Sequence, residues 1–147
     1  MAKAIEIAKY FVSLSDEDAG DTVSNLKVQK LLYYAQGFAL VILGKPLFDE
    51  DIEAWNHGPV VASVYHELKN FGSGGVKFDK TGTEQDFSIG QEEQQLLNDV
   101  YEAYGQFSAW KLRDMTHIEA PWVETTQGCF ISHKKLIKHF KTLVDDE

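Results

Sequence analysis

The hydrophobic positions of this chain are most regular between Ser24 and Gly44. Apolar residues recur there with the spacing that makes one face of an α-helix apolar, and a second apolar stripe lies at an angle to the first. The two stripes are Val28, Leu31, Leu32, Ala35, Phe38, Ala39 and Ile42, and Leu26, Tyr33 and Leu40. The strip expected to face water is Lys27, Lys30, Tyr34, Gly37 and Val41. Other elements pack around a helix that is apolar over most of its circumference, so we predict a central helix over residues 25–43.

The predicted central helix carries capping residues at both ends. The hydroxyl of Ser24 can accept from an unpaired backbone N–H, and Gly44 suits the left-handed position that follows a helix. Gln29 and Gln36, seven residues apart, lie between the apolar stripes. Two interpretations stay open for them: a half-buried amide pair that bonds a neighbouring loop, or a polar device that sets the packing register or contacts a partner.

Helical periodicity continues through most of the chain. It predicts further helices over about 2–14, 60–71, 89–104, 109–117 and 132–144. We place Pro59 in the first turn of the second of these, and Ser108 and Ser132 at the N-caps of the last two. In the last helix, the residues expected to face inward are Leu136, Ile137, Phe140, Leu143 and Val144.

Short extended segments add a small β element to this helical pattern. They lie at about 47–55 and 76–88, where apolar and polar residues alternate between turn residues. The fold class that follows is mainly α. We predict a single compact domain over residues 1–147, with five to six helices around the central buried helix and a small β-hairpin or short sheet.

Composition narrows the choice of environment and partner. The 147 residues are 44% hydrophobic and 12% aromatic, enough to bury one core. The formal net charge of −9 disfavours direct binding to nucleic acid, whose phosphates reward clustered Lys and Arg. Cys129 is the only cysteine, and no apolar run reaches the roughly 18–20 residues that a membrane span needs. We therefore expect a cytoplasmic protein that does not associate with membranes.

The charge is unevenly distributed along the chain. Residues 132–144 hold four lysines and no acidic residue, a formal +4, so the rest of the chain holds −9 − 4 = −13. One interpretation is a solvated basic helix face near acidic neighbours. The other is a docking surface for an acidic partner.

The histidines and the cysteine form no recognisable catalytic or metal-binding pattern. His57 and His66 do not share a predicted helix, and His133 and His139 are six residues apart on different faces. A lone Cys129 cannot anchor a zinc site and lacks a local nucleophile signature. The glycine-containing segments match neither the Walker nor the Rossmann spacing. We predict no metal, no cofactor and no enzymatic activity.

Two segments, 54–60 and 116–122, each combine a tryptophan, a histidine and a proline at a break between predicted elements. Tryptophans held by prolines offer a large contact area at low entropic cost, which suits a recognition surface. The alternative is a pair of well-packed helix junctions. On the first interpretation each segment forms one edge of the partner-binding surface, and the residues are Trp55, His57, Gly58 and Pro59 with Thr116, His117, Pro121 and Trp122.

Three segments resemble the Panacea domain family, which comprises SocA-like antitoxins and phage-associated proteins. They are LKVQKLLYYAQG at 26–37, EAWNHGPVV at 53–61 with Tyr65 a few residues on, and THIEAPW at 116–122. Their order and rough spacing also match, so the resemblance extends over nearly the whole chain.

This resemblance implies a mostly helical domain that neutralises a protein toxin encoded nearby, either by occluding it or by delivering it to a cellular protease. Such domains are paired with many different toxins, so the family does not specify which toxin is bound. Two other functions stay open: a phage or prophage regulator that binds a host protein, and a small hydrolase that uses Cys129 or His117.

Overall fold

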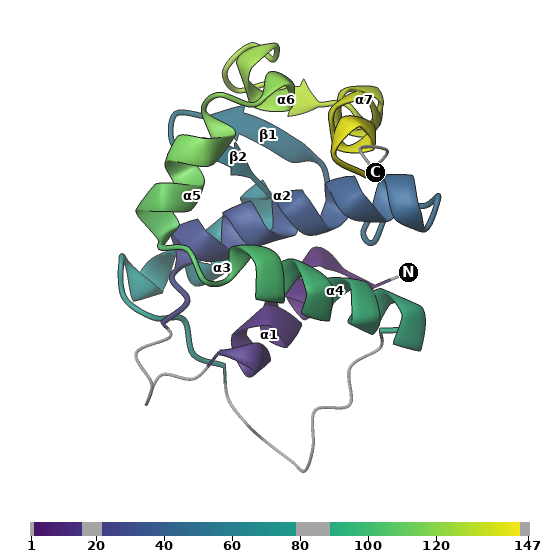
Figure 1. The fold of residues 1–147 in the computed structure, drawn as a ribbon. Helices are drawn as coiled ribbons and strands as arrows, with labels where there is room; N and C mark the ends of the chain where they lie inside the picture. Colours follow the sequence, from purple (N-terminus) through teal and green to yellow (C-terminus); the bar gives the residue numbers. More distant parts are fainter. Residues whose placement is uncertain (1, 16–21, 79–88, 145–147) are drawn as a thin grey trace.

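The computed structural model describes residues 2–15, 22–78 and 89–144, which form seven α-helices, a 3₁₀ turn and a three-stranded antiparallel sheet (Figure 1). The elements in chain order are α1 (Ala4–Leu14), α2 (Asn25–Ile42), β1 (Ile52–Trp55), β2 (Gly58–Val60), α3 (Ala62–Leu68), η2 (Lys69–Phe71), α4 (Gln91–Tyr104), α5 (Ala109–Thr116), α6 (Ala120–Val123), β3 (Phe130–Ile131) and α7 (His133–Val144).

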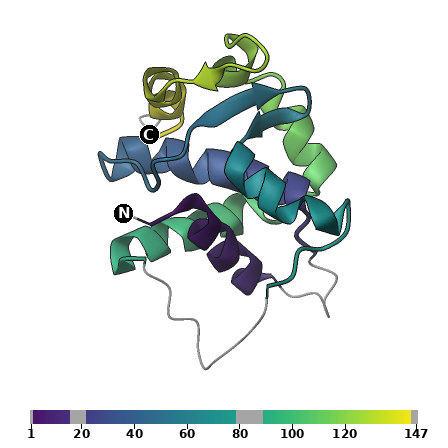
Figure 2. The ribbon, with the colours of Figure 1, turned by 180° about the vertical axis from the view of Figure 1, so that it is seen from behind.

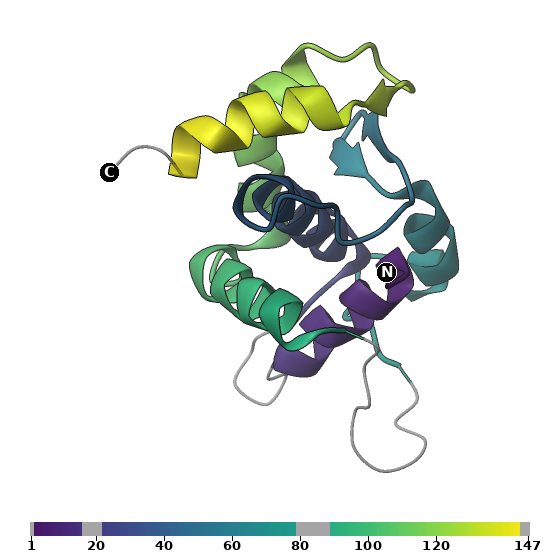
Figure 3. The same cartoon turned by 90° about the vertical axis from the view of Figure 1, so that its right-hand side faces the viewer.

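Helix α2 is the element around which the others are arranged. In Figure 1 it crosses the middle of the molecule, with α1 and α4 below it and α5, α6, α7 and the sheet above it. Figure 3, viewed nearly along α2, shows α7, α4 and α1 distributed around it. Of its 18 residues 13 are buried, so it is enclosed on all sides. The predicted mainly α fold, with six other helices around a central one in the described residues, is confirmed.

The prediction that one strip of α2 faces water is wrong. Lys27 and Lys30 are 5% and 0% exposed. The Lys27 ammonium donates to the carbonyl oxygen of Gly105 at 2.6 Å, and the Lys30 ammonium donates to that of Pro59 at 3.1 Å. A lysine stem is apolar and long, so it can lie along a helix interface while its amine reaches a backbone oxygen.

Close packing of α7 buries the other end of the same strip. A Cβ on Gly37 would lie 2.2 Å from Cε2 of Phe140, so α7 crosses α2 where α2 has no side chain. Tyr34 is fully buried, and its ring stacks on Tyr104 with the centroids 4.0 Å apart. Ile42, expected to face inward, is 53% exposed because α2 extends past its neighbours there.

The capping predictions are confirmed. The hydroxyls of Ser24, Ser108 and Ser132 accept from the backbone N–H three residues on, at 3.3, 3.1 and 3.2 Å. Gly44 has a φ of 72°, as the left-handed position after α2 requires.

The two glutamines of α2 act as the amide pair that bonds neighbouring loops. Both are buried. Gln36 accepts from Leu47 N–H at 2.7 Å and donates to the Phe48 carbonyl at 2.9 Å. Gln29 accepts from Val61 N–H at 2.9 Å. These bonds fix both ends of the segment that contains β1 and β2.

The sheet has the strand order β2-β1-β3, with β2 and β3 at its edges. Strand β1 confirms the extended segment near 47–55, but its partners were predicted wrongly. They are β2, immediately after a tight turn, and the two-residue β3. Pro59 lies in β2 rather than in a helix, which is compatible with its missing N–H because β2 is an edge strand. Figure 2 shows this hairpin leading into α3 on the back of the molecule.

The second predicted extended segment forms no strand where the structure describes it. Within 76–78 no strand is present, and the neighbouring Gly75 makes only an isolated bridge with Ser24. The rest of that prediction, residues 79–88, lies outside the described residues.

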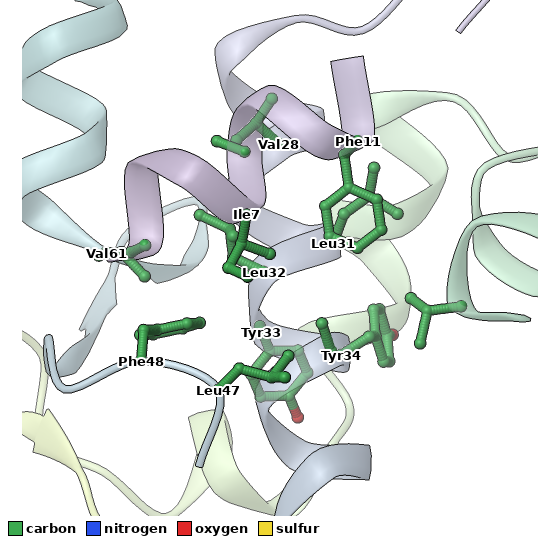
Figure 4. Packing of buried hydrophobic residues seen from close by; sticks show 14 of the residues in the cluster. Ile7, Phe11, Val28, Leu31, Leu32, Tyr33, Tyr34, Leu47, Phe48 and Val61 are labelled. Carbon is green, nitrogen blue, oxygen red and sulfur yellow. The ribbon is translucent and has the colours of Figure 1, made fainter. Parts of the chain in front are cut away.

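The hydrophobic core lies on both sides of α2. Figure 4 shows Ile7 and Phe11 of α1 near Leu31 and Leu32 of α2, with Phe48 at the sheet side. In α7, Leu136 and Phe140 are fully buried as predicted, whereas Ile137 and Leu143 are 40% and 46% exposed. That part of the prediction is wrong because α7 is covered on one side only. Nowhere in the described chain is there a helix of the length and apolarity that crossing a bilayer requires.

Candidate protein-binding site

The turn between β1 and β2 is held against α2 and α5. Trp55 pairs with Gly58 across the hairpin, leaving Asn56 and His57 as the two turn residues. Gly58 has a φ of 112°, and a Cβ there would lie 2.7 Å from Cε of Lys30 and 2.9 Å from Oγ1 of Thr116. Both the conformation and the close approach therefore require glycine.

His117, at the end of α5, joins this turn to the helix. Its Nδ1 lies 2.7 Å from the Arg113 carbonyl oxygen, and its Nε2 lies 2.9 Å from the Asn56 carbonyl oxygen. Both neighbours are acceptors, and a neutral imidazole can donate through only one nitrogen. His117 therefore bridges the last turn of α5 and the β1–β2 turn.

Trp122 of α6 makes the second connection between the two segments. Its indole N–H donates to the carbonyl oxygen of Trp55 at 2.7 Å, and its ring lies 4.1 Å from that of His117, centroid to centroid. The Trp55 ring packs against Tyr65 of α3, with the ring centroids 5.0 Å apart. The two segments predicted as separate edges thus form one continuous junction.

An exposed cluster lies on α5 beside this junction. Trp110 is 59% exposed, and the Arg113 guanidinium lies 4.7 Å from its ring centroid. Arg113 also donates through Nε to Nδ1 of His57 at 3.1 Å, and the His57 ring lies 5.8 Å from that of Trp110. We call Trp55, His57, Trp110, Arg113, His117 and Trp122 the junction surface.

The predicted site residues differ in their exposure. His57 is exposed, and Trp55, His117 and Trp122 are half-buried. The remaining four are buried, namely Gly58, Pro59, Thr116 and Pro121. Thr116 donates to the Arg113 carbonyl at 2.9 Å. These four are therefore placed to position the junction.

Sequence reasoning missed Trp110 and Arg113. A signal for them was available, because residues 110, 113 and 117 recur at the spacing of one helix face, opposite the buried Leu112 and Thr116. It was overlooked because α5 is short and the two conspicuous segments flank it.

Buried polar groups of α2 lie beneath the junction and bond to it. Lys30, fully buried, donates to the Pro59 carbonyl. Burial, and to a smaller extent the nearby Arg113 guanidinium, lowers the pKa of Lys30 from 10.5 to about 7. The amine is thus held next to the hairpin with one backbone oxygen as its hydrogen-bond partner.

Glu119, at the N-terminus of α6, is fixed by two tyrosines of α2. Tyr33 and Tyr34 donate to its two carboxylate oxygens, each at 2.8 Å. Burial raises the pKa of Glu119, while the two tyrosine hydrogen bonds oppose that rise. Burial and the neighbouring carboxylate also raise the pKa of both tyrosines. This network sets where α6 begins, and with it the position of Trp122.

The side chains that catalysis or metal binding would need are either in contact with backbone groups of the chain or not grouped together. In the described parts of the chain, no group of three or more His, Cys, Asp or Glu is placed to hold a metal ion. Cys129 is an exposed free thiol in the turn before β3. Both ring nitrogens of His117 face carbonyl oxygens of its own chain. The arrangement thus provides an exposed aromatic and cationic surface on a rigid support.

Comparison with known proteins agrees with the segments that form this junction. A family model described as "Antitoxin SocA-like, Panacea domain" matches residues 28–123. The chain belongs to this Panacea family. The resemblance seen in the sequence is thereby confirmed, and the matched range contains both halves of the junction, whereas α1 and α7 lie outside it.

One curated relative of this Panacea chain is Antitoxin SocA of Caulobacter vibrioides (strain NA1000 / CB15N), 46% identical over 56 residues. That match covers 38% of this chain and 28% of the relative, so it spans less than a third of the relative's length. None of the solved structures matches the chain significantly.

Proposed function

We propose that this Panacea domain is an antitoxin that neutralises a cognate protein toxin by direct binding, with the junction surface as the contact. The observation that carries the proposal is Trp110, 59% exposed and held in place by Arg113 and His57. Aromatic residues and arginine dominate the binding energy of protein interfaces. Membership of an antitoxin family makes a toxin the natural partner.

The residues of the junction divide into two roles in this proposal. Trp110 and His57 contact the toxin because both are exposed, and the half-buried Arg113 joins them because it lies against both rings. His117 and Trp122 add contact area at the half-buried centre, and the half-buried Trp55 adds contact area where its ring packs against Tyr65. The buried Gly58, Pro59, Thr116 and Pro121 act by positioning. Because the hydrogen bonds across the junction already order these side chains, little conformational entropy is lost on binding.

Neutralisation of this kind requires binding and no chemistry. The domain is not an enzyme, and neutralisation needs no metal or cofactor. Direct binding to nucleic acid is disfavoured by the net charge of −9. We place the complex in the cytoplasm, where a lone free cysteine is kept reduced. We further propose that residues 1–147 fold as one Panacea-like unit, since α1 and α7 both pack on α2.

A growth assay tests the proposal. The adjacent gene is induced with and without this one, and wild type is expected to restore growth that the adjacent product stops. Trp110→Ala is expected to restore less growth at equal protein level. Ile42→Ala, which truncates an exposed apolar side chain at the far end of α2, is the matched control and is expected to act like wild type.

The outcomes separate the competing functions. An adjacent product that is harmless without this protein contradicts the antitoxin proposal and favours a phage or prophage regulator that binds a host protein. Loss of rescue in Cys129→Ala or His117→Ala with toxin binding intact favours the hydrolase. The half-life of the toxin separates the two modes of neutralisation: occlusion leaves it unchanged, whereas delivery to a cellular protease shortens it.

A further inference from the structure

The exposed side of α7 carries cations that the rest of the described chain does not pair. Lys134, Lys138 and Lys141 recur at i, i+4 and i+7, and all three are exposed. They lie opposite Leu136 and Phe140, which are fully buried against α2. The ion pairs found within residues 2–15, 22–78 and 89–144 involve none of these lysines.

Lys135, the fourth lysine of α7, has a different role. Its ammonium donates to the Glu124 carbonyl at 2.7 Å and to the Thr125 hydroxyl at 3.1 Å. These two hydrogen bonds connect α7 to the loop after α6. They help to hold the helix, and with it the exposed lysines, in one orientation. The basic face is therefore presented on a rigid element.

An exposed apolar side chain and a small pocket border the basic face. Ile137 is 40% exposed on the neighbouring side of α7. A pocket of about 160 Å³ lies between α6 and α7, with Pro121, Lys138 and Thr142 among its lining residues. Pockets that hold small-molecule ligands are larger, about 300–1,000 Å³, so this one suits a single side chain of a partner protein.

The geometry points to α7 as a docking face for a short acidic segment of a partner protein, a contact separate from the junction surface. The segment that fits is a helix whose carboxylates recur at i, i+4 and i+7, beside an apolar residue for Ile137. Lys134 and Lys141 lie about 10 Å apart along the helix axis, so three carboxylates at the same spacing can face three lysines. Charge complementarity of this kind chiefly sets orientation and association rate.

The charge of the rest of the chain favours a short segment over a nucleic acid. Residues 132–144 hold +4 and the remainder holds −9 − 4 = −13. A DNA duplex carries one charge per roughly 1.7 Å and extends well beyond the helix, so it meets the acidic remainder as well. A short acidic helix ends where the basic face ends.

Binding of a synthetic peptide tests this inference. The probe is a short helical peptide with glutamates at i, i+4 and i+7 and one leucine, and its counterpart has glutamine in place of glutamate. At low ionic strength the glutamate peptide is expected to bind, and to lose affinity as salt is added. Reversing the three lysines of the face to glutamate is expected to lower its affinity by about tenfold.

The matched control makes the same change of net charge elsewhere, with glutamate at three other exposed lysines, namely Lys3, Lys9 and Lys69. It is expected to lower the affinity much less than reversal on α7, and Trp110→Ala is expected to leave it unchanged. Equal loss in the control triple, equal binding of the glutamine peptide, or tighter binding of duplex DNA than of the glutamate peptide would each overturn the inference. Neutralising the acidic residues at 145–147 is expected to preserve or strengthen peptide binding, and weaker binding would contradict it.

Discussion

Replacing Lys30 by methionine probes the buried support of the junction. Lys30 is fully buried, and its amine donates to one backbone oxygen, that of Pro59. Its pKa is lowered from 10.5 to about 7 by burial, with a smaller contribution from Arg113. Methionine keeps the length of the stem and removes the ionisable group, so the two proteins differ in whether an amine must be buried.

The size of the pH effect on the free energy of unfolding follows from the pKa of Lys30, 10.5 in the unfolded chain and about 7 in the folded one. Because the folded pKa is the lower one, the unfolded chain binds more protons between about pH 7 and 10.5, and the free energy of unfolding rises with pH across that window. The full effect is about 5 kcal/mol, and about 3 kcal/mol of it falls between pH 6 and pH 9. Relative to Lys30→Met, wild type is therefore expected to gain about 3 kcal/mol between these pH values.

Urea denaturation at pH 6 and pH 9 measures the difference. Since the other titrating groups are common to both proteins, their contributions cancel. Lys69→Met, at an exposed lysine, is the control and is expected to follow the pH dependence of wild type. If the free energy of unfolding changes equally in wild type and Lys30→Met between the two pH values, Lys30 titrates as it does in water. Its amine is then not buried beneath the junction.

Two further changes test the packing of α2. Leu31→Ala, at a fully buried position, is expected to lower the free energy of unfolding by about 2–5 kcal/mol, and an unchanged melting temperature would show that the core is elsewhere. Gly37→Ala places a methyl group 2.2 Å from Cε2 of Phe140. It is expected to lower the free energy of unfolding by about 1–3 kcal/mol. The comparison is Ala39→Gly, a change in the same helix that adds no side chain. A Gly37→Ala variant as stable as wild type would show that α7 does not cross α2 at this point.

The centre of the fold could be predicted from the sequence because α2 is specified by local signals. Its apolar stripes and the serine at its start are read within one stretch of chain, and Gln29 and Gln36 mark where loops must be bonded. What failed was the placement of Lys30, since a sequence shows a charged side chain but not the backbone oxygen that its amine can reach. That oxygen belongs to Pro59, 29 positions away.

Long-range pairing explains the other errors. Strand β1 was recognisable, but its partner β3 has only two residues and lies more than 70 positions further on, too short to show an alternating pattern. The exposed side of α7 was partly misjudged because periodicity marks which residues are apolar, whereas neighbouring elements decide how many of them are covered.

The junction was predictable in part of its residues but not in its arrangement. Tryptophan, histidine and proline at two breaks marked the two segments that meet there, and whether they bind a partner stays a prediction. The two segments meet through contacts between residues more than 60 positions apart, such as His117 with the Asn56 carbonyl. The support of α6 by Tyr33 and Tyr34 through Glu119 is of the same kind. Trp110 was missed although residues 110, 113 and 117 share one face of α5, because that helix is short and the two conspicuous segments flank it.

The most direct test of toxin binding at the junction surface measures two quantities for each variant. They are its affinity for the product of the adjacent gene and its melting temperature. Trp110→Ala is expected to raise the dissociation constant about 30-fold, equivalent to about 2 kcal/mol, at an unchanged melting temperature. Ile42→Ala is expected to change neither quantity. If Trp110→Ala and His57→Ala both bind the adjacent gene product as wild type does, the junction surface is scaffold and the proposed contact with a toxin is wrong.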